Sequence, residues 1–516
     1  MLPVRPTVPR WATLEHWAAD TRSLFTSVGA VGFVVALGCL VAFAAAAANS
    51  LRPAAGLVAA MAFPVLAFGS GNPRLFCLWA LMFALPFDFS VYIGPVSDRA
   101  GGERALRLEM SDPMILALFA FQARDLLTGR WPGLRVPKVI LIWLLIMLVW
   151  GVGTLAGLLA GHFRFAAGYE VVRMLKVALL FVVLVNELDT PSRMLHAAMA
   201  LALSVLFQAG VGLAQYIHGQ PFGLEFLGEV GAKTAEDLAS FSVRDARVFR
   251  ISGFVLHPNL FGIFLAACLP LVLACLMIMR GLAARLLFGV AGAAGFVALI
   301  LTQSRSAWVA FAGASGIVLL LMVMHRRLFR LSISTAAVGG VALAIAIGAF
   351  HEPIMKRLFD SQDAAAIGRE EFKDDARRLI DDSYMMGWGL NQYVQELPPY
   401  MKTSARSYSY WIPPVHNIYY LWWAETGLIG LAVHLVMWIS IALMAVRNLR
   451  VRDELLFTVN VACLAAMVAF AVDGFLSFSL RVNPISRTYW VLAAMIYATY
   501  YWRRQQETQH QRQGTA

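Results

Sequence analysis

Three groups of polar residues follow one another along an otherwise apolar chain. The groups are Arg250-Ile-Ser-Gly253 with His257-Pro258-Asn259, then Ser304-Arg305-Ser306, then His416-Asn417 with Glu425 further along. The guanidinium group of arginine binds phosphate oxygens in a planar, two-pronged geometry. A neutral imidazole near pH 7 can accept the proton of an attacking hydroxyl. These residue types therefore predict a site for a phosphate-like anion, with Arg250 and Arg305 as its cations and His416 as the proton acceptor.

Several of these side chains also fit a plainer structural role. Pro258 and Asn259 are typical of a helix start, so we expect His257 to have a structural or binding role. Glu425 could orient a partner or could be a buried, hydrogen-bonded carboxyl group. Asp473, near the end of a later apolar run, is open to the same two interpretations.

A further pair of cations, Arg173 and Lys176, lies near the start of another apolar run. Residues three apart share one face of a helix. Cations this close to hydrocarbon are costly unless they are paired or used, so both are candidates for the anion site. The alternatives are that they extend to the membrane interface or that they pair with Glu170.

The composition places this chemistry in a membrane. Of 516 residues, 59% are apolar and only 14% are charged, whereas an ordinary soluble protein is about 25% charged. The mean hydropathy is +0.68. Soluble multidomain proteins, secreted disulfide scaffolds and disordered chains are excluded. All five cysteines lie in apolar runs, and no metal-ligand or nucleotide-binding motif occurs, so we expect neither a metal nor another cofactor.

A membrane span needs roughly 20 apolar residues, and fourteen such runs occur. They lie near 26–49, 52–70, 75–92, 112–128, 138–160, 169–186, 194–217, 259–279, 286–303, 307–324, 331–350, 415–445, 455–475 and 487–502. The expected fold is an all-α, polytopic bundle of about 14 transmembrane helices.

Lysine and arginine set the orientation of such a bundle, because they accumulate in cytoplasmic segments. With both termini placed inside, the inside segments hold 20 basic against 8 acidic residues. This accounts for the formal net charge of +11. The positive charge is therefore explained by the membrane topology, and we expect no nucleic acid partner. All three polar groups then open helices at the outer face. Helix N-termini expose unpaired N–H groups and attract anions.

The expected organisation follows from this topology. It comprises a seven-span region (1–217), an extracytoplasmic loop (218–258), spans bearing two of the motifs (259–350), a long extracytoplasmic loop (351–414), the C-terminal spans (415–502) and a cytoplasmic tail (503–516). The second loop contains helix-like stretches such as 370–379. We expect it to form a mostly helical cap.

Over residues 250–428 the chain resembles the bacterial O-antigen ligase and O-antigen or exopolysaccharide polymerase superfamily. The resemblance rests on the three groups above, on Gly368-Arg369, on Gly387-Trp388-Gly389-Leu390-Asn391, and on Glu425-Thr426-Gly427, in matching order and spacing. One departure lies before Gly387, where the family often has a proline and this sequence has Ser383-Tyr384. That departure concerns the loop geometry.

The resemblance implies a GT-C-type glycosyltransferase of the bacterial inner membrane, with its active site on the periplasmic face. Such an enzyme takes glycan from undecaprenyl diphosphate without metal or nucleotide sugar. By resemblance, Arg250, Arg305 and Arg369 hold the diphosphate and His416 activates the acceptor, with Asn259, Ser304, Ser306 and Asn417 in support. We expect inversion at the anomeric carbon.

Two acceptors fit these motifs. A polymerase would use a lipid-linked repeat unit, with a chain-length regulator as a further partner, and a ligase would use lipid A-core. The large span count and the His257-Pro258-Asn259 motif favour the polymerase. A flippase for the same lipids is the alternative from another class. Transporters usually carry internal repeats and polar residues at the midplane, whereas here the polar residues gather at the outer face.

Overall fold

The computed structural model describes residues 63, 65–93, 105–131, 133–157, 165–231, 240–243, 246–325, 348, 364–402 and 414–514. The predicted span 26–49, and most of the predicted spans 52–70 and 331–350, lie outside the described residues. The total of fourteen spans therefore stays a prediction.

Eleven helices occupy the predicted spans that the described residues cover. They are α4 (Pro73–Ala84), α5 (Asp112–Leu127), α6 (Lys138–Leu155), α7 (Phe165–Glu187), α8 (Pro191–His218), α10 (Pro258–Ile278), α11 (Leu282–Leu301), α12 (Arg305–Met324), α17 (Ile418–Arg447), α18 (Glu454–Gly474) and α19 (Asn483–Gly514). Within the described part of the chain, seven of these are long and apolar enough to cross a membrane: α6, α8, α10, α11, α12, α17 and α18. The all-α, polytopic membrane fold is thus confirmed.

The predicted span 75–92 is shorter than expected. Helix α4 ends at Ala84, and strand β1 (Ser90–Ile93) follows it. Pro86 explains the end of the helix, since proline lacks an N–H group and disfavours helical geometry in the residue before it. Strand β1 pairs antiparallel with β2 (Leu106–Glu109).

Among the seven apolar spans, α10 and α18 are the most deeply buried, and they pack against each other. Helix α18 also packs against α12, α19 and α17, while α8 packs against α11 and α7 against α19. At one end of α18 the Phe457 ring lies 4.5 Å from that of His325, just beyond α12. Helices α12 and α18 are therefore antiparallel, and the N-terminus of α12 lies toward Gly474.

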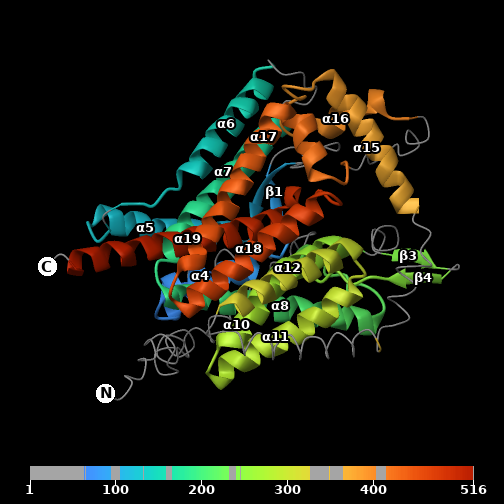
Figure 1. The fold of residues 1–516 in the computed structure, drawn as a ribbon. Helices are drawn as coiled ribbons and strands as arrows, with labels where there is room; N and C mark the ends of the chain where they lie inside the picture. The colour runs from blue at the N-terminus through green and yellow to red at the C-terminus, as the bar shows by residue number, and fades with distance from the viewer. Residues whose placement is uncertain are drawn as a thin grey trace.

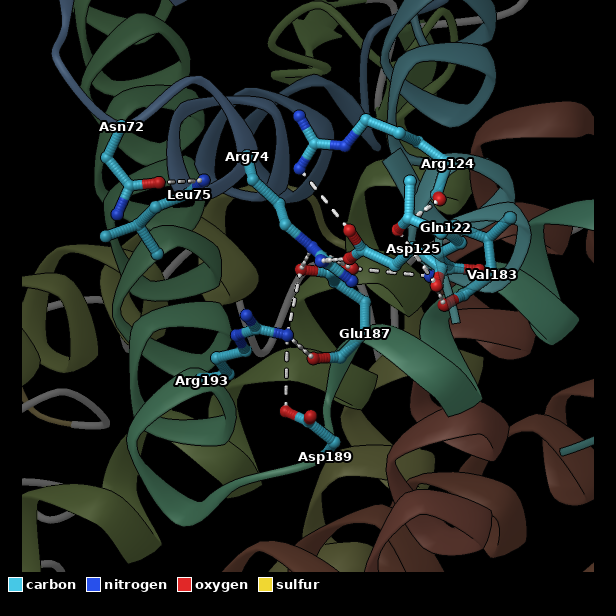
Figure 2. A network of polar contacts seen from close by, with 11 residues as sticks. Asn72, Arg74, Leu75, Gln122, Arg124, Asp125, Val183, Glu187, Asp189 and Arg193 are labelled. Atoms are coloured by element: carbon cyan, nitrogen blue, oxygen red, sulfur yellow. Dashed lines mark hydrogen bonds and ion pairs between the residues drawn. The ribbon is translucent and has the colours of Figure 1, made fainter. Parts of the chain in front are cut away.

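An ion-pair network joins four helices at one end of the bundle (Figure 2). Glu187 closes α7, is 1% exposed, and accepts from Nε of Arg74 on α4 at 2.8 Å. Arg74 also pairs with Asp125 of α5, and Arg193 of α8 lies 3.3 Å from Glu187. Since all four helices contribute a charged group, the network fixes their ends relative to one another.

The two predicted loops carry the remaining structure at the other end. The first holds a 3-10 turn, η2 (Glu225–Leu227), and the hairpin β3 (Ser240–Val243) and β4 (Ala246–Phe249). The second holds α15 (Ala364–Asp382), α16 (Tyr393–Glu396) and η4 (Pro398–Tyr400). Figure 1 shows hairpin β3–β4 and α15 on the right, opposite the C-terminus of α19.

Candidate active site at the helix N-termini

Each of the three polar groups caps the start of a helix. His257 is the N-cap of α10, and its Nδ1 accepts from the N–H of Asn259 at 3.0 Å. Ser304 is the N-cap of α12, one residue before Arg305. The side chain of Asn417, the N-cap of α17, accepts from the N–H groups of Tyr419 and Tyr420 at 3.0 and 3.1 Å. The local prediction of three helix starts is therefore confirmed.

These N-termini converge around the C-terminal end of α18. Helix α10 packs so closely on the second motif that a Cβ placed on Gly262 would lie 3.0 Å from Cβ of Ser304. At the C-terminal end of α18, Asn417 Nδ2 donates to the carbonyl of Phe475 at 3.3 Å. The hydroxyl of Tyr419 donates to the carbonyl of Ala471 at 2.8 Å. The antiparallel packing of α18 thus brings residues from distant parts of the chain to one end of the bundle.

Arg250 is buried and held at two points. Its Nε donates to the carbonyl of Thr302, at the end of α11, at 2.8 Å. One terminal nitrogen donates to Oδ1 of Asn259 at 2.5 Å. The guanidinium therefore links the first motif to the second, with an exposed fraction of only 5%. A positive charge is fixed where two helix N-termini already concentrate N–H groups.

Two buried glutamines on one face of α8 hold the loop that carries Arg250. Oε1 of Gln215 accepts from the N–H groups of Ser252 and Gly253 at 3.2 and 2.9 Å. Oε1 of Gln208 accepts from the N–H of Phe254 at 2.9 Å. Gly253 has φ +55°, and an added Cβ would lie 2.7 Å from Oε1 of Gln208. The loop therefore requires glycine at this position.

Gln215 is itself held by a buried carboxylate, Glu229. Nε2 of Gln215 donates to Oε1 of Glu229 at 2.7 Å. Glu229 also accepts from the N–H groups of Phe222 at 2.8 Å and Leu224 at 2.7 Å. This carboxylate organises the start of the first loop and, through Gln215, the position of Arg250.

Arg305 follows a strained turn and begins α12 with its side chain partly buried. The turn places Gln303 at φ +51°, an uncommon conformation for a residue with a side chain. The hydroxyls of Ser304 and Ser306 lie 3.3 Å apart. The second motif is therefore a compact polar turn at the N-terminus of α12.

His416 lies just before α17 with its side chain partly buried. Its ring meets that of Phe478 edge to face, with centroids 5.3 Å apart. The following residue, Asn417, is tied to the end of α18 as described above. The candidate proton acceptor is thus positioned by the segment that joins α18 to α19.

Helix α17 is broken at Gly427, where φ is +65° and ψ −175°. The break releases helical carbonyls, and residues 383–391, which we call the tryptophan loop, supply their partners. The N–H of Trp388 donates to the backbone carbonyl of Ala424 at 2.9 Å. The N–H of Gly389 donates to the backbone carbonyl of Glu425, also at 2.9 Å. The N–H of Leu428 donates to the carbonyl of Tyr384 at 2.9 Å. The motif at 387–391 and the motif at 425–427 are therefore joined by backbone hydrogen bonds into one unit.

The same loop is tied to the helices on its other side. Trp150 Nε1 donates to the carbonyl of Met386 at 3.0 Å, and Thr154 accepts from the N–H of Leu390 at 3.2 Å. Asn391 Nδ2 donates to the carbonyl of Ala166 at 3.0 Å. Loop 383–391 therefore links α6 and α7 to α17.

Glu425 is a buried carboxylate with a cationic partner that the sequence analysis did not identify. Its Oε2 lies 2.8 Å from a terminal nitrogen of Arg481, and both side chains are at most 2% exposed. Arg481 ends the 3-10 turn η7 (Ser479–Arg481), between α18 and α19. The two residues are 56 positions apart, so the sequence does not reveal the pair. An arginine among apolar residues near the end of a span does, however, indicate that it has a partner.

Arg173 and Lys176 both bind carboxylates. Nε of Arg173 donates to Glu170 at 3.0 Å, as in the alternative considered above. Lys176 lies 2.8 Å from Asp112 and 3.4 Å from Glu109. Their role in anion binding stays a prediction. Arg369 belongs to α15, but its side chain lies outside the described residues.

Glu109 is the centre of a second buried cluster that sequence reasoning missed. Nη1 of Arg487 lies 3.0 Å from its Oε2, and Nδ2 of Asn483 donates to its Oε1 at 2.5 Å. Burial raises the pKa of this carboxyl group, but Arg487, Lys176 and Arg107 outweigh burial and lower the pKa below its ordinary value.

Among the described side chains, no three His, Cys, Asp or Glu groups converge as a metal site requires.

Comparison with known proteins identifies part of the chain. Residues 290–435 match the family model described as O-antigen ligase. This region is therefore similar to the O-antigen ligase family. The match contains the Ser304-Arg305-Ser306 turn, the tryptophan loop and the whole motif from His416 to Gly427, so the resemblance to the ligase and polymerase superfamily is confirmed there. No curated protein matches the chain.

Proposed function

We propose that this O-antigen ligase-like protein transfers glycan from undecaprenyl diphosphate to a sugar hydroxyl. The family match supports a glycosyltransferase of the ligase and polymerase type. The observation that carries the finer proposal is the convergence of the N-termini of α10, α12 and α17, with Arg250, Arg305 and His416 at their starts. A diphosphate is the anion that such a cluster of N–H groups and arginines suits.

The proposed reaction is a single displacement. The acceptor oxygen attacks the anomeric carbon of the donor while His416 takes the hydroxyl proton. The bond between that carbon and the phosphate oxygen breaks, and the diphosphate leaves on its lipid. Because attack and departure occur on opposite faces, the product has inverted configuration. Arg250 and Arg305 stabilise the negative charge that develops on the leaving oxygen, which is the largest catalytic contribution in sites of this kind.

The location of the site suits a lipid-linked donor. A polyprenyl chain stays in the membrane while its diphosphate lies at the interface, and the three motifs lie at helix ends. In the proposed orientation the protein spans the bacterial inner membrane with both termini in the cytoplasm and the site facing the periplasm. Arg369, Arg173 and Lys176 are proposed as further cations near the diphosphate. Glu170 binds Arg173, and Asp112 and Glu109 bind Lys176, so these carboxylates would hold the two cations in position.

Transfer by the purified protein tests the assignment. We expect Arg305→Ala to lower kcat on the order of 100-fold or more and His416→Ala on the order of 100- to 10,000-fold. Gln220→Ala, an exposed polar residue outside the motifs, is the matched control with wild-type turnover. Wild-type transfer by correctly inserted Arg305→Ala and His416→Ala proteins contradicts the site. Movement of the lipid across proteoliposomes without change in its glycan supports a flippase instead.

The acceptor defines two forms of the proposal. We propose a polymerase that joins lipid-linked repeat units, with a chain-length regulator as partner. The ligase form has a specific observation in its favour, because the matching family is described as O-antigen ligase. Supplying lipid-linked repeat units with and without lipid A-core distinguishes the two. A ladder of lipid-linked products without lipid A-core supports the polymerase, and products formed only on lipid A-core contradict it.

A further inference from the structure

The pair between Glu425 and Arg481 belongs to a chain of four buried charges. Arg481 lies 2.8 Å from Glu425 through one terminal nitrogen and 3.3 Å from Glu170 through the other. Glu170 also binds Arg173, which donates to the hydroxyl of Ser486 at 3.1 Å. Two carboxylates and two guanidiniums balance in charge, and Glu170, Glu425 and Arg481 are at most 2% exposed at their side chains.

The segment that carries Arg481 also contacts the N-terminal end of α17. The Phe478 ring packs on the ring of His416, and the Phe475 carbonyl accepts from Asn417. The hydroxyl of Ser479 donates to the buried carboxylate of Asp473 at the end of α18. Residues 473–481 therefore form a single bonded turn, which we call the α18–α19 turn.

The outer part of α17 is short and separately oriented. It begins at Ile418 and ends at the break at Gly427. At its start Asn417 is bound to the α18–α19 turn, and near its end Glu425 is bound to Arg481 of the same turn. A helix segment held at both ends by one turn cannot rotate or tilt without breaking one of these contacts.

We propose that Arg481 is a positioning residue for the transfer reaction. By holding Glu425 it fixes the outer segment of α17 and the α18–α19 turn relative to each other, and so fixes the imidazole of His416 between them. Arg481 touches neither donor nor acceptor. This inference rests on the proposed role of His416 as the proton acceptor.

Four variants test the inference: Arg481→Gln, Arg481→Lys, Glu425→Gln and the double variant Arg481→Gln/Glu425→Gln. The readouts are kcat, the KM for the lipid diphosphate donor, and the pH profile of kcat. We expect Arg481→Gln to lower kcat at least tenfold, with a change in donor KM of less than threefold, because Arg481 is not one of the proposed diphosphate cations. Arg481→Lys restores at least part of the loss, because it keeps one cationic partner for Glu425.

The double variant guards against simple misfolding, since it removes both charges and leaves no unpaired carboxylate. We expect it to insert and fold, to retain a lowered kcat, and to shift the acidic limb of the pH profile, because His416 then has altered surroundings. The matched control is Arg74→Gln, which removes one arginine from the buried Glu187 at the other end of α7 (Figure 2). Glu187 lies 17 residues from Glu170, about 25 Å along the helix, so kcat should stay within twofold of wild type.

The results separate this inference from the function on which it rests. Inactive His416→Ala with an Arg481→Gln/Glu425→Gln protein of wild-type kcat and pH profile overturns the positioning role alone. Full activity of His416→Ala overturns the proposed function. Equal losses in Arg74→Gln and Arg481→Gln also overturn the inference, because they show a general need for buried ion pairs.

Discussion

Gly387 and Gly427, forty residues apart, lie in backbone contact. A Cβ on Gly387 would overlap the amide nitrogen of Gly427, and a Cβ on Gly427 would overlap the carbonyl of Met385. Both glycines have positive φ, +70° and +65°. The break in α17 and the tryptophan loop can therefore coexist only where neither residue has a side chain.

The first prediction concerns these glycines. Gly387→Ala and Gly427→Ala should each destabilise the protein by about 1–3 kcal/mol from backbone strain alone, with the steric overlap adding to that. Thermal unfolding in detergent measures the effect as a lowered Tm. Gly313→Ala is the control, because an added Cβ there meets nothing within 4 Å inside α12. A Tm for Gly427→Ala equal to that of Gly313→Ala contradicts the interlocked arrangement.

A second prediction concerns Gln215, which holds the loop of Arg250. Gln215→Ala leaves the N–H groups of Ser252 and Gly253 and the carboxylate of Glu229 without this partner. Unsatisfied buried groups cost about 1–3 kcal/mol each, so both stability and donor binding should fall. Donor KM and Tm are the measurements. The exposed Gln220→Ala should change neither, and an unchanged donor KM in folded Gln215→Ala protein argues against this support of Arg250.

The third prediction distinguishes charge from shape at Arg250. Lysine keeps the charge but cannot donate at once to the carbonyl of Thr302 and to Asn259 as the guanidinium does. We expect Arg250→Lys to lose on the order of 100-fold in kcat, as loss of one preorganised charge donor does in other enzymes. Transfer assays at saturating donor check this. Wild-type kcat in Arg250→Lys shows that charge alone suffices.

The fourth prediction is a pH dependence of stability centred on Glu109. Its pKa is lower in the folded protein than the ordinary value of about 4.3, so folding favours the ionised form. This stabilisation is present above the unfolded-state pKa and is lost as pH falls through the folded-state pKa. Glu109→Gln should therefore lower stability at pH 7, by about 3–5 kcal/mol if the buried pairs are broken.

The gap between wild type and Glu109→Gln should narrow as pH falls below about 4. Tm measured from pH 3 to pH 7 gives the comparison. Glu370 is exposed, so Glu370→Gln should track wild type at every pH. A gap that stays constant across the range excludes ionisation of Glu109 as the cause.

Local signals in the sequence predicted the helices and their starts closely. Helix α10 begins at Pro258, one residue from the predicted 259, because the apolar run and the proline act within a single turn of chain. The break at Gly427 had no such signal. Its cause is the hydrogen bonding of a loop some forty residues away, and the flanking sequence by itself is typical of an unbroken apolar helix.

Charged residues whose partners are distant in the sequence were likewise not predicted. Arg250, Arg305 and His416 stand beside glycine, serine and asparagine, so their motifs were visible. Arg481 has its partners 56 and 311 residues away, at Glu425 and Glu170. Only the fold brings these groups together, and sequence reasoning accordingly left Glu425 with two interpretations. The structure places it in an ion pair.

The break in α17 has a consequence for the order in which the chain assembles. Hydrocarbon offers no partner to the carbonyls of Ala424 and Glu425, and each unmet group there costs several kcal/mol. Their donors, Trp388 and Gly389, precede α17 and so leave the ribosome first. When α17 enters the bilayer, the segment that completes its hydrogen bonding has already been synthesised. A variant in which this loop is moved after α17 in the chain should therefore insert poorly, even with every residue retained.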